Sequence, residues 1–185
     1  RRAGKSYILR QIVRKLIQSN INPQNIFFIN KEFTDFDFVR DYRELESLVK
    51  LYREKLNPQG KVWLFIDEIQ NVHGWEHFVN SLSQDFVNSY EIFISGSNSK
   101  MLSGELATLL SGRYVSFEIF PFSFNEYAGI TEKEISKQSF IEYLESGALP
   151  ELFVLPNDET KRNYISAIKD TILLRDIIKI QKRIN

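Results

Sequence analysis

The sequence predicts an α/β fold: a three-layer parallel sheet followed by a small all-helical part. Two observations carry this prediction. Before Pro121, short apolar runs alternate with amphipathic helical patterns, which is typical of parallel strands joined by crossover helices. From Ser123 onward the patterns are helical alone. Since 185 residues suffice for one domain with a small appendage, we expect an α/β core over residues 1–120 and a helical part over residues 121–185.

Local patterns place the first elements of the core. Residues 6–19 carry apolar side chains at the helical period and predict a helix with one apolar face. Residues 25–30 form a short apolar run that is typical of a buried strand. Asp41 is suited to cap a helix over residues 42–56, which turn residues then end.

The rest of the core follows the same alternation. Residues 61–68 form an apolar run that ends in two acids, as expected of a strand buried on both faces. Residues 115–119 alternate apolar and polar side chains and predict a strand that Pro121 ends. The other expected core elements are a helix, a strand and a second helix, over residues 75–88, 90–95 and 100–110.

The helical part is expected to contain three helices. A short helix covers residues 123–127, and a helical region covers residues 131–146 and ends at Gly147. A long helix begins at Asp158 or Thr160 and continues to the C-terminus.

The composition favours a folded protein and excludes several kinds of site. Apolar residues make up 43% of the chain and aromatic residues 14%, which is enough to fill a core. Lys and Arg (24) balance Asp and Glu (24), so bulk charge gives no indication of nucleic-acid binding. The absence of Cys excludes disulfides and thiolate metal sites. No apolar run reaches the roughly 18–20 residues of a membrane span, so we expect a cytoplasmic protein without membrane contact.

The first six residues match the end of a phosphate-binding loop, G-x-x-x-x-G-K-[ST], whose leading glycine would lie two residues before Arg1. In this motif, backbone N–H groups of the loop and of the following helix bind phosphate oxygens, here those of Arg2, Ala3 and Gly4. Lys5 would reach the β- and γ-phosphates, and the Ser6 hydroxyl would ligate Mg²⁺. The alternative is a basic N-terminal tail, because Gly-Lys-Ser also occurs by chance in surface turns.

Two acids, Asp67 and Glu68, end the apolar run over residues 61–68. Carboxylates at the end of such a strand lie where open α/β sheets bind ligands. We expect Asp67 to hold Mg²⁺, directly or through water, and Glu68 to polarise an attacking water as general base. The alternative is a strand that ends in a solvated acid pair, but the presence of both motifs in the right order favours nucleotide hydrolysis.

Small polar residues follow the strand over residues 90–95. Ser97 or Asn98 in this cluster would sense the γ-phosphate and orient the attacking water. The alternative is a Ser/Asn turn that caps the following helix.

Together these features resemble the AAA-type P-loop ATPases of archaea and bacteria that are usually described only as predicted ATPases. The resemblance runs through nearly the whole chain and is carried by residues 1–6, 65–70, 94–99, 111–114, 117–126 and 172–176. It implies a P-loop NTPase-like fold and a Mg²⁺-dependent ATPase, which hydrolyses ATP to drive a change between the α/β core and the helical part. A further C-terminal domain usually follows in this family.

The resemblance also implies roles for single residues. Asn30 is placed like the residue that restrains the catalytic glutamate in related ATPases, and Ser97 or Asn98 is placed like the phosphate sensor. Arg113 is the candidate arginine finger, which could act on a neighbouring subunit of a homo-oligomer. The alternative for Arg113 is an ion pair with Glu118 or Asp67.

One departure concerns the strand before the phosphate loop, which is central to the sheet in this fold. That strand would lie upstream of Arg1, so we expect unpaired backbone and a groove in the sheet.

Other functions stay open at this point. Asp67-Glu68-Ile69-Gln70 resembles motif II of some helicases, so a nucleic-acid-dependent motor is the enzymatic alternative. The non-enzymatic alternative is a nucleotide-gated scaffold whose helical part binds a protein partner; neither a protein nor a DNA partner can be named.

His73 and His77 have a spacing that can bind zinc, but H-E-x-x-H is not met and Gly74 would exclude His73 from the helix.

Overall fold

The computed structural model describes residues 2–96, 110 and 112–172. The chain forms two compact units, one from Ala3 to Glu118 and the other from Ile119 to Asn185. The helix expected over residues 100–110 lies outside the described residues except for Leu110, and so does the C-terminal part of the long helix.

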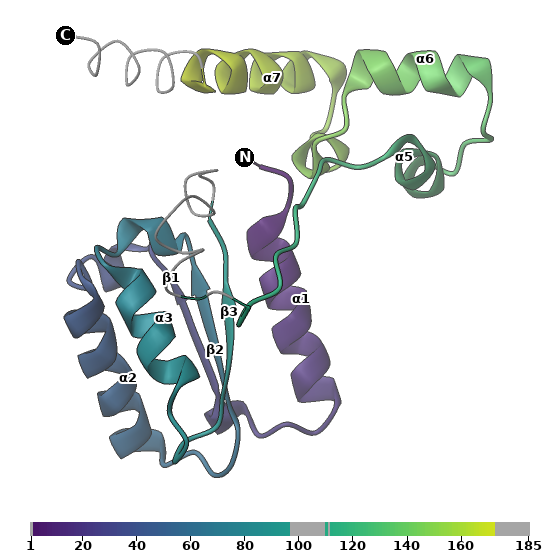
Figure 1. Cartoon of the computed structure of the whole chain (residues 1–185). Coiled ribbons are helices and arrows are strands. Elements are labelled where there is room, and N and C mark those ends of the chain that lie inside the picture. Colours follow the sequence, from purple (N-terminus) through teal and green to yellow (C-terminus); the bar gives the residue numbers. More distant parts are fainter. Residues whose placement is uncertain (1, 97–109, 111, 173–185) are drawn as a thin grey trace, which may run out of the picture. The chain divides into compact units, whose positions relative to one another are not determined.

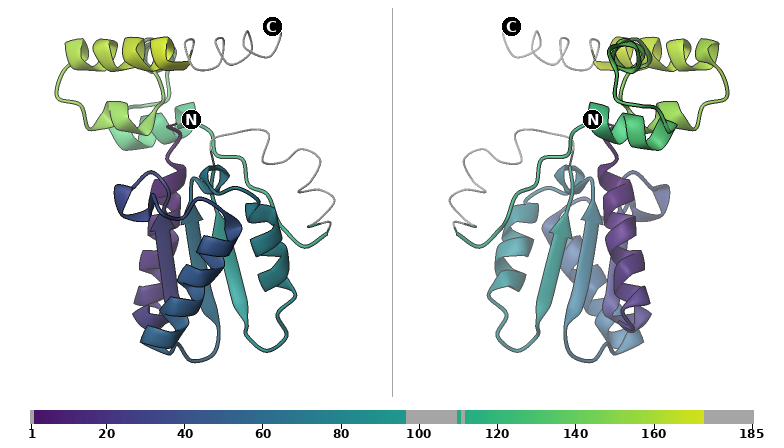
Figure 2. Two further views of the ribbon diagram at one scale, coloured as in Figure 1. Left: turned by 90° about the vertical axis from the view of Figure 1, so that its left-hand side faces the viewer. Right: turned by 90° about the vertical axis from the view of Figure 1, so that its right-hand side faces the viewer.

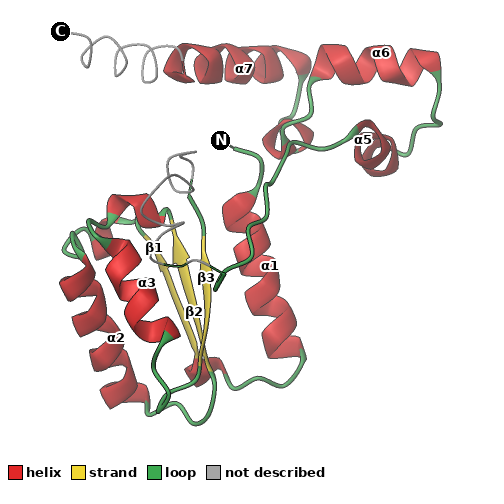
Figure 3. Cartoon of the chain, in the orientation of Figure 1, coloured by secondary structure: helices red, strands yellow, loops and turns green. Residues whose placement is uncertain are grey.

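The first unit has three layers, as Figures 1 and 3 show. Its parallel sheet contains β1 (Ile26–Asn30), β2 (Val62–Asp67) and β3 (Tyr90–Ile94), in the order β1-β2-β3. Helix α1 (Lys5–Gln18) covers one face, and α2 (Tyr42–Leu56) and α3 (Trp75–Ser83) cover the other. Figure 2 shows the sheet from its two faces, with α2 and α3 nearer the viewer in the left view and α1 nearer the viewer in the right view. The predicted α/β fold with a parallel sheet is confirmed, and the strands lie side by side, so the described sheet contains no internal gap.

The main core lies between the sheet and the α2–α3 layer. Leu64 and Ile66 of β2 are fully buried there, against Leu45 of α2 and Phe78 of α3. Burial on both faces explains why β2 reads as a continuous apolar run rather than an alternating one.

The face of the sheet that α1 covers carries side chains in lateral rows. Phe28, Phe65 and Phe93 occupy one row, because Phe65 is paired in register with both of the others. Their rings are stacked, with centroids 6.2 Å apart for Phe28 and Phe65 and 4.7 Å apart for Phe65 and Phe93. Since side chains alternate between faces, the next row on this face contains the residues two positions further along each strand.

A capping box begins α2. The Asp41 carboxylate accepts hydrogen bonds from the N–H groups of Arg43 (2.8 Å) and Glu44 (3.1 Å), and the Glu44 carboxylate accepts one from the Asp41 N–H (3.2 Å). These bonds satisfy N–H groups that have no partner within the helix. The predicted cap and both predicted ends of this helix are confirmed.

Two core predictions were wrong. Helix α3 ends at Ser83 instead of Asn88, because the Asp85 carboxylate accepts hydrogen bonds from the Val87 and Asn88 N–H groups (both 2.9 Å), which forms a turn. Residues 115–119 form no strand with any part of the chain that the structure describes. Their alternation indicates an extended backbone, but a strand also needs a neighbour, and Phe117 is 79% exposed.

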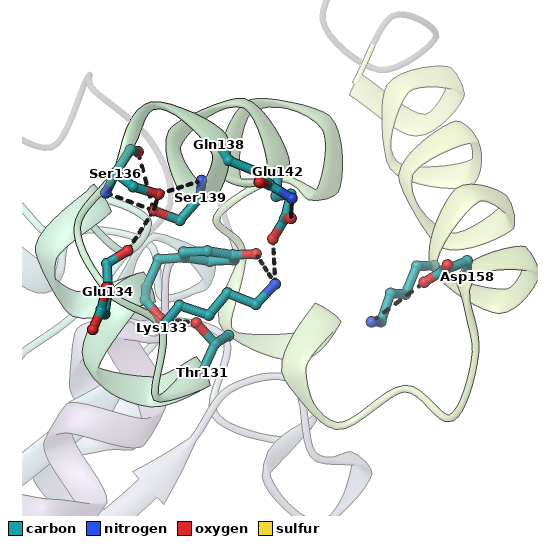
Figure 4. Close-up of polar contacts among 10 residues, drawn as sticks. Thr131, Lys133, Glu134, Ser136, Gln138, Ser139, Glu142 and Asp158 are labelled. Atoms are coloured by element: carbon teal, nitrogen blue, oxygen red, sulfur yellow. Dashed lines mark hydrogen bonds and ion pairs between the residues drawn. The ribbon is translucent and has the colours of Figure 1, made fainter.

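The second unit is helical, as predicted. Its described residues form three helices and a 3₁₀ turn: α5 (Phe124–Thr131), α6 (Lys137–Ser146), η5 (Pro150–Phe153) and α7 (Asp158–Ile172). Helix α6 begins at Lys137, later than expected, because Ser136 and Ser139 form a capping box there (Figure 4). The unit packs through aromatic rings in edge-to-face contact, such as Tyr127 with Tyr143. At the edge of this cluster, the Lys133 ammonium donates hydrogen bonds to the Glu142 carboxylate and to the Tyr127 hydroxyl (Figure 4).

Candidate functional site

The phosphate-loop residues form the start of α1. Gly4 precedes the helix with φ of 93°, in the left-handed region that favours glycine. The first helical hydrogen bond runs from the Ile8 N–H to the Gly4 carbonyl (3.0 Å). Among the described residues no side chain caps this helix, and its first turn contains no acidic residue, so neither a cap nor a first-turn acid neutralises the positive end of its dipole. Arg2 is exposed, Ala3 is buried, and Lys5 and Ser6 are half-buried.

This helix start lies at the carboxyl end of the sheet. Helix α1 runs opposite to the strands, so its first turn and the ends of all three strands lie at the same end of the first unit (Figure 1). The structure therefore brings Lys5 and Ser6 to the edge of the sheet that also carries Asp67 and Glu68.

Asp67 is the centre of a buried polar row. Its side chain is 0% exposed, and Oδ2 accepts a 3.1 Å hydrogen bond from the Asn30 Nδ2. Oδ1 accepts a hydrogen bond from the Ser95 hydroxyl. Asn30, Asp67 and Ser95 continue the phenylalanine row by one step toward the carboxyl edge. A carboxylate has about four acceptor positions, and described residues of the two neighbouring strands fill two of those of Asp67.

Asn30 therefore serves Asp67 in this structure. Its Nδ2 donates to Asp67, and its Oδ1 accepts the Glu32 N–H at 2.8 Å. The role toward Glu68 that the family resemblance implies for Asn30 stays a prediction.

Glu68 has a backbone conformation that few residues other than glycine adopt. Its φ and ψ are 56° and 46°. The backbone is held on both sides, because the Lys31 N–H bonds the Asp67 carbonyl and the Ile69 N–H bonds the Ser95 carbonyl, each at 3.0 Å. The left-handed conformation costs free energy, so these neighbouring bonds must hold Glu68 in it. Such strain is often found at functional sites.

The Glu68 carboxylate also has a side-chain partner. Its Oε2 accepts a hydrogen bond from the Nε2 of Gln70, which lies two residues further on in η3 (Ile69–Asn71). The pair is partly buried. Glu68 is thus fixed in both backbone and side chain.

Two loops beside the site are tied to each other. The His73 N–H bonds the Arg40 carbonyl (2.8 Å), and the Tyr42 N–H bonds the His73 carbonyl (3.0 Å). Lys31 anchors the first loop through a bond from Nζ to the Phe36 carbonyl. Burial lowers the pKa of Lys31, although Asp37 and Glu44 oppose this shift.

The roles of the remaining predicted site residues stay predictions. Ser97 and Asn98 lie outside the described residues. Arg113 is exposed, and among the residues that the structure describes its side chain contacts Asn80 of α3, at 3.5 Å. The predicted zinc spacing gains no support, since the described part of the chain holds no group of three His, Cys, Asp or Glu residues suited to a metal.

The sequence analysis does not predict two residues of the site. In the sequence, Ser95 marks the end of a strand, and Gln70 belongs to the Asp-Glu-Ile-Gln motif. Parallel register would have found Ser95, because Ile66 pairs with Ile94 and the next pair is Asp67 with Ser95. No sequence signal indicated the left-handed conformation that brings Gln70 to Glu68.

Comparison with protein families decides the classification of the chain. The family model described as "AAA domain" matches residues 1–128. The chain belongs to the AAA domain family. This confirms the resemblance drawn from the motifs and supports a nucleotide-binding, ATPase-like domain.

Two relatives of this AAA domain are described only as uncharacterized proteins. One, from Haemophilus influenzae, is 40% identical over 184 residues, which cover 96% of the chain and 44% of the relative. The other, from Methanocaldococcus jannaschii, is 33% identical, and the match covers 97% of the chain and 40% of the relative. The chain thus spans less than half the length of either relative. No solved structure matches the chain. Among the described helices, none has the length and apolar character to span a membrane.

Proposed function

We propose that this AAA domain binds ATP with Mg²⁺ and hydrolyses it to ADP and phosphate. One observation carries the proposal: Gly4-Lys5-Ser6 begins an uncapped helix at the edge of the sheet where β2 ends in Asp67 and Glu68. Phosphate oxygens need hydrogen-bond donors, and an attacking water needs a carboxylate nearby. This edge of the sheet provides both.

The phosphate side of the proposal rests on α1. The N–H groups of the first turn and the Lys5 ammonium are donors for the β- and γ-phosphate oxygens. Gly4 has no Cβ, so the backbone can approach a phosphate closely.

The metal side rests on oxygen ligands, which Mg²⁺ prefers. The Ser6 hydroxyl and the Asp67 carboxylate would hold the ion, directly or through water. When bound, Mg²⁺ neutralises charge that develops on the phosphates. Asn30 and Ser95 hold Asp67 in one orientation, so it needs no ordering when the ion binds.

Glu68 is the proposed general base. It follows Asp67 directly, its left-handed backbone is clamped by bonds on both sides, and its side chain is half-buried. A fixed base contributes more than a mobile one, because its orientation has been set before the substrate arrives.

We further propose that Arg113 acts on the site of a neighbouring copy, as its exposure and its 3.5 Å contact with Asn80 permit. Ser97 or Asn98 would sense the γ-phosphate. Hydrolysis would then drive a change between the α/β core and the helical unit.

The test is ATP binding and phosphate release by the longest natural form of the protein that contains these 185 residues. Lys5→Ala should weaken ATP binding about tenfold or more, while the matched Lys15→Ala on the same helix should not. Glu68→Gln should bind ATP normally but release phosphate at least about a hundredfold more slowly, and Glu54→Gln should match the unsubstituted protein.

Three outcomes decide between the alternatives. If the protein neither binds nor hydrolyses ATP, the proposal is wrong. If it binds ATP, and Glu68→Gln leaves phosphate release unchanged, the assigned base is wrong. If single-stranded or duplex DNA or RNA strongly stimulates turnover, the nucleic-acid-dependent motor replaces the general ATPase.

A further inference from the structure

The hydrogen bond between Glu68 and Gln70 assigns a role to a residue outside the predicted site. We propose that Gln70 is a positioning residue, whose carboxamide aims the Glu68 carboxylate at the attacking water. The inference rests on the proposed ATPase function, and it separates two tasks: Asn30 and Ser95 orient the metal-binding acid, and Gln70 orients the base.

The backbone brings the two side chains together. Glu68 lies in the left-handed region, and the single 3₁₀ turn of η3 follows it, with the Asn71 N–H bonding the Glu68 carbonyl at 3.1 Å. If β2 simply continued, residues 68 and 70 would point to the same face but would lie about 6.5 to 7 Å apart along the strand. The change in backbone direction at Glu68 and the 3₁₀ turn replace this extended spacing, and Gln70 Nε2 reaches Glu68 Oε2.

The chemistry of the pair fits a positioning role. The carboxamide donates one bond to Oε2, and a carboxylate has further acceptor positions that can accept a bond from a water molecule. The bond restricts the rotation of the Glu68 side chain before substrate binds, so less conformational entropy is lost when the base is oriented for the reaction. A carboxylate at position 70 could not donate when ionised and would repel Glu68, and an asparagine there would be one methylene shorter.

The first experiment measures steady-state ATP turnover. Gln70→Met keeps the length of the side chain and removes the donor, so kcat should fall about ten- to a hundredfold while KM stays within about twofold. Gln70→Glu should lose at least as much, and Gln11→Met, an exposed position on α1, should lose nothing. An unchanged kcat in both Gln70 variants, with cooperative unfolding intact, would overturn the inference.

A double-mutant cycle shows whether Gln70 acts through Glu68. If it does, Gln70→Met should produce no further loss in the Glu68→Gln protein, whose residual rate already lacks the base. A full additional loss there would mean that Gln70 acts on the fold or on another group, and would overturn the positioning role.

A second readout is independent of turnover. In ¹⁵N NMR spectra of the protein without nucleotide, the side-chain amide signals of Gln70 are identified by their loss in Gln70→Met. They should move in Glu68→Ala and stay in place in Glu76→Ala. Unmoved signals would overturn the inference at any turnover rate. If the signals move but the unsubstituted protein hydrolyses no ATP, the bond is real, and the proposed function and the catalytic role of Gln70 both fail.

Discussion

Asn30 and Asp67 are paired in the parallel register of β1 and β2, and the Asn30 Nδ2 donates a 3.1 Å hydrogen bond to the Asp67 Oδ2. The bond joins two side chains of one lateral row on the face that α1 covers. Ser95 extends this row from the other side. A fully buried acid is costly unless it is hydrogen-bonded, and the row supplies its partners.

This row makes the stability of the first unit sensitive to Asp67. In Asp67→Ala the Asn30 amide and the Ser95 hydroxyl lose their acceptor, so the free energy of unfolding should fall by about 1–3 kcal/mol. Urea denaturation measures the change. Asp35→Ala, at an exposed position, is the control, and an identical urea midpoint for Asp67→Ala and the unsubstituted protein would contradict the prediction.

The left-handed backbone of Glu68 predicts a conflict between stability and activity. Glycine adopts this conformation without penalty, so Glu68→Gly should be more stable than Glu68→Ala by about 1 kcal/mol, while both lose turnover. Lys50→Gly, within α2, should instead be about 1 kcal/mol less stable than Lys50→Ala. Equal stability of the two Glu68 variants would show that the site is not strained.

The capping box of α2 predicts a local loss of stability. Asp41→Ala removes the acceptor for two N–H groups of the first turn and should lower the free energy of unfolding by about 1 kcal/mol. Glu46→Ala, on the same helix, should change it by less than about 0.5 kcal/mol. Thermal unfolding, followed by circular dichroism, compares the two; a loss no larger for Asp41→Ala would argue against the cap.

Tyr52 predicts a loss of stability at alkaline pH. Burial raises the pKa of its hydroxyl to about 12, opposed by Arg53 and reinforced by Tyr90, and the hydroxyl donates to the Gln24 carbonyl. An unfolded tyrosine has a pKa of about 10, so the folded protein holds this proton more tightly. The contribution is complete below about pH 10 and is lost as the pH rises through about 12.

The measurement is urea denaturation at several pH values from 9 to 12. The unsubstituted protein should lose stability more steeply than Tyr52→Phe over this range, because the variant has no proton to lose at this position. Tyr7→Phe, at an exposed tyrosine, should behave like the unsubstituted protein. Parallel curves for all three proteins would rule out the assigned cause.

Most of the fold could be predicted because its signals are local. Both ends of α2 follow from a cap and from turn residues that stand next to them in the chain. The predicted end of α3 at Asn88 was wrong, because the Asp85 side chain accepts bonds from backbone N–H groups that a longer helix would use. The predicted strand over residues 115–119 was wrong, because a strand needs a neighbouring strand to bond to. Alternation of side chains within one segment gives no information about such a neighbour.

The sequence predicted only those site residues whose position follows from a single strand. Asp67 and Glu68 could be placed at the edge of the sheet because they end an apolar run. The position of Ser95 beside Asp67 depends on the register between two strands, and the contact of Gln70 with Glu68 depends on a left-handed residue. The spacing of residues in the sequence indicates neither of these.

The bonds that frame Glu68 have a consequence for how this protein opens. The Lys31, Ile69 and Ser95 N–H groups, which join the three strand ends, extend the ladder of the sheet itself. We therefore expect the edge of the sheet that carries Asp67 and Glu68 to unfold in the same cooperative unit as the core. Hydrogen exchange at these three amides would then report the global unfolding free energy, and a destabilising change anywhere in the sheet would lower the population of intact sites by the same factor as the population of folded molecules.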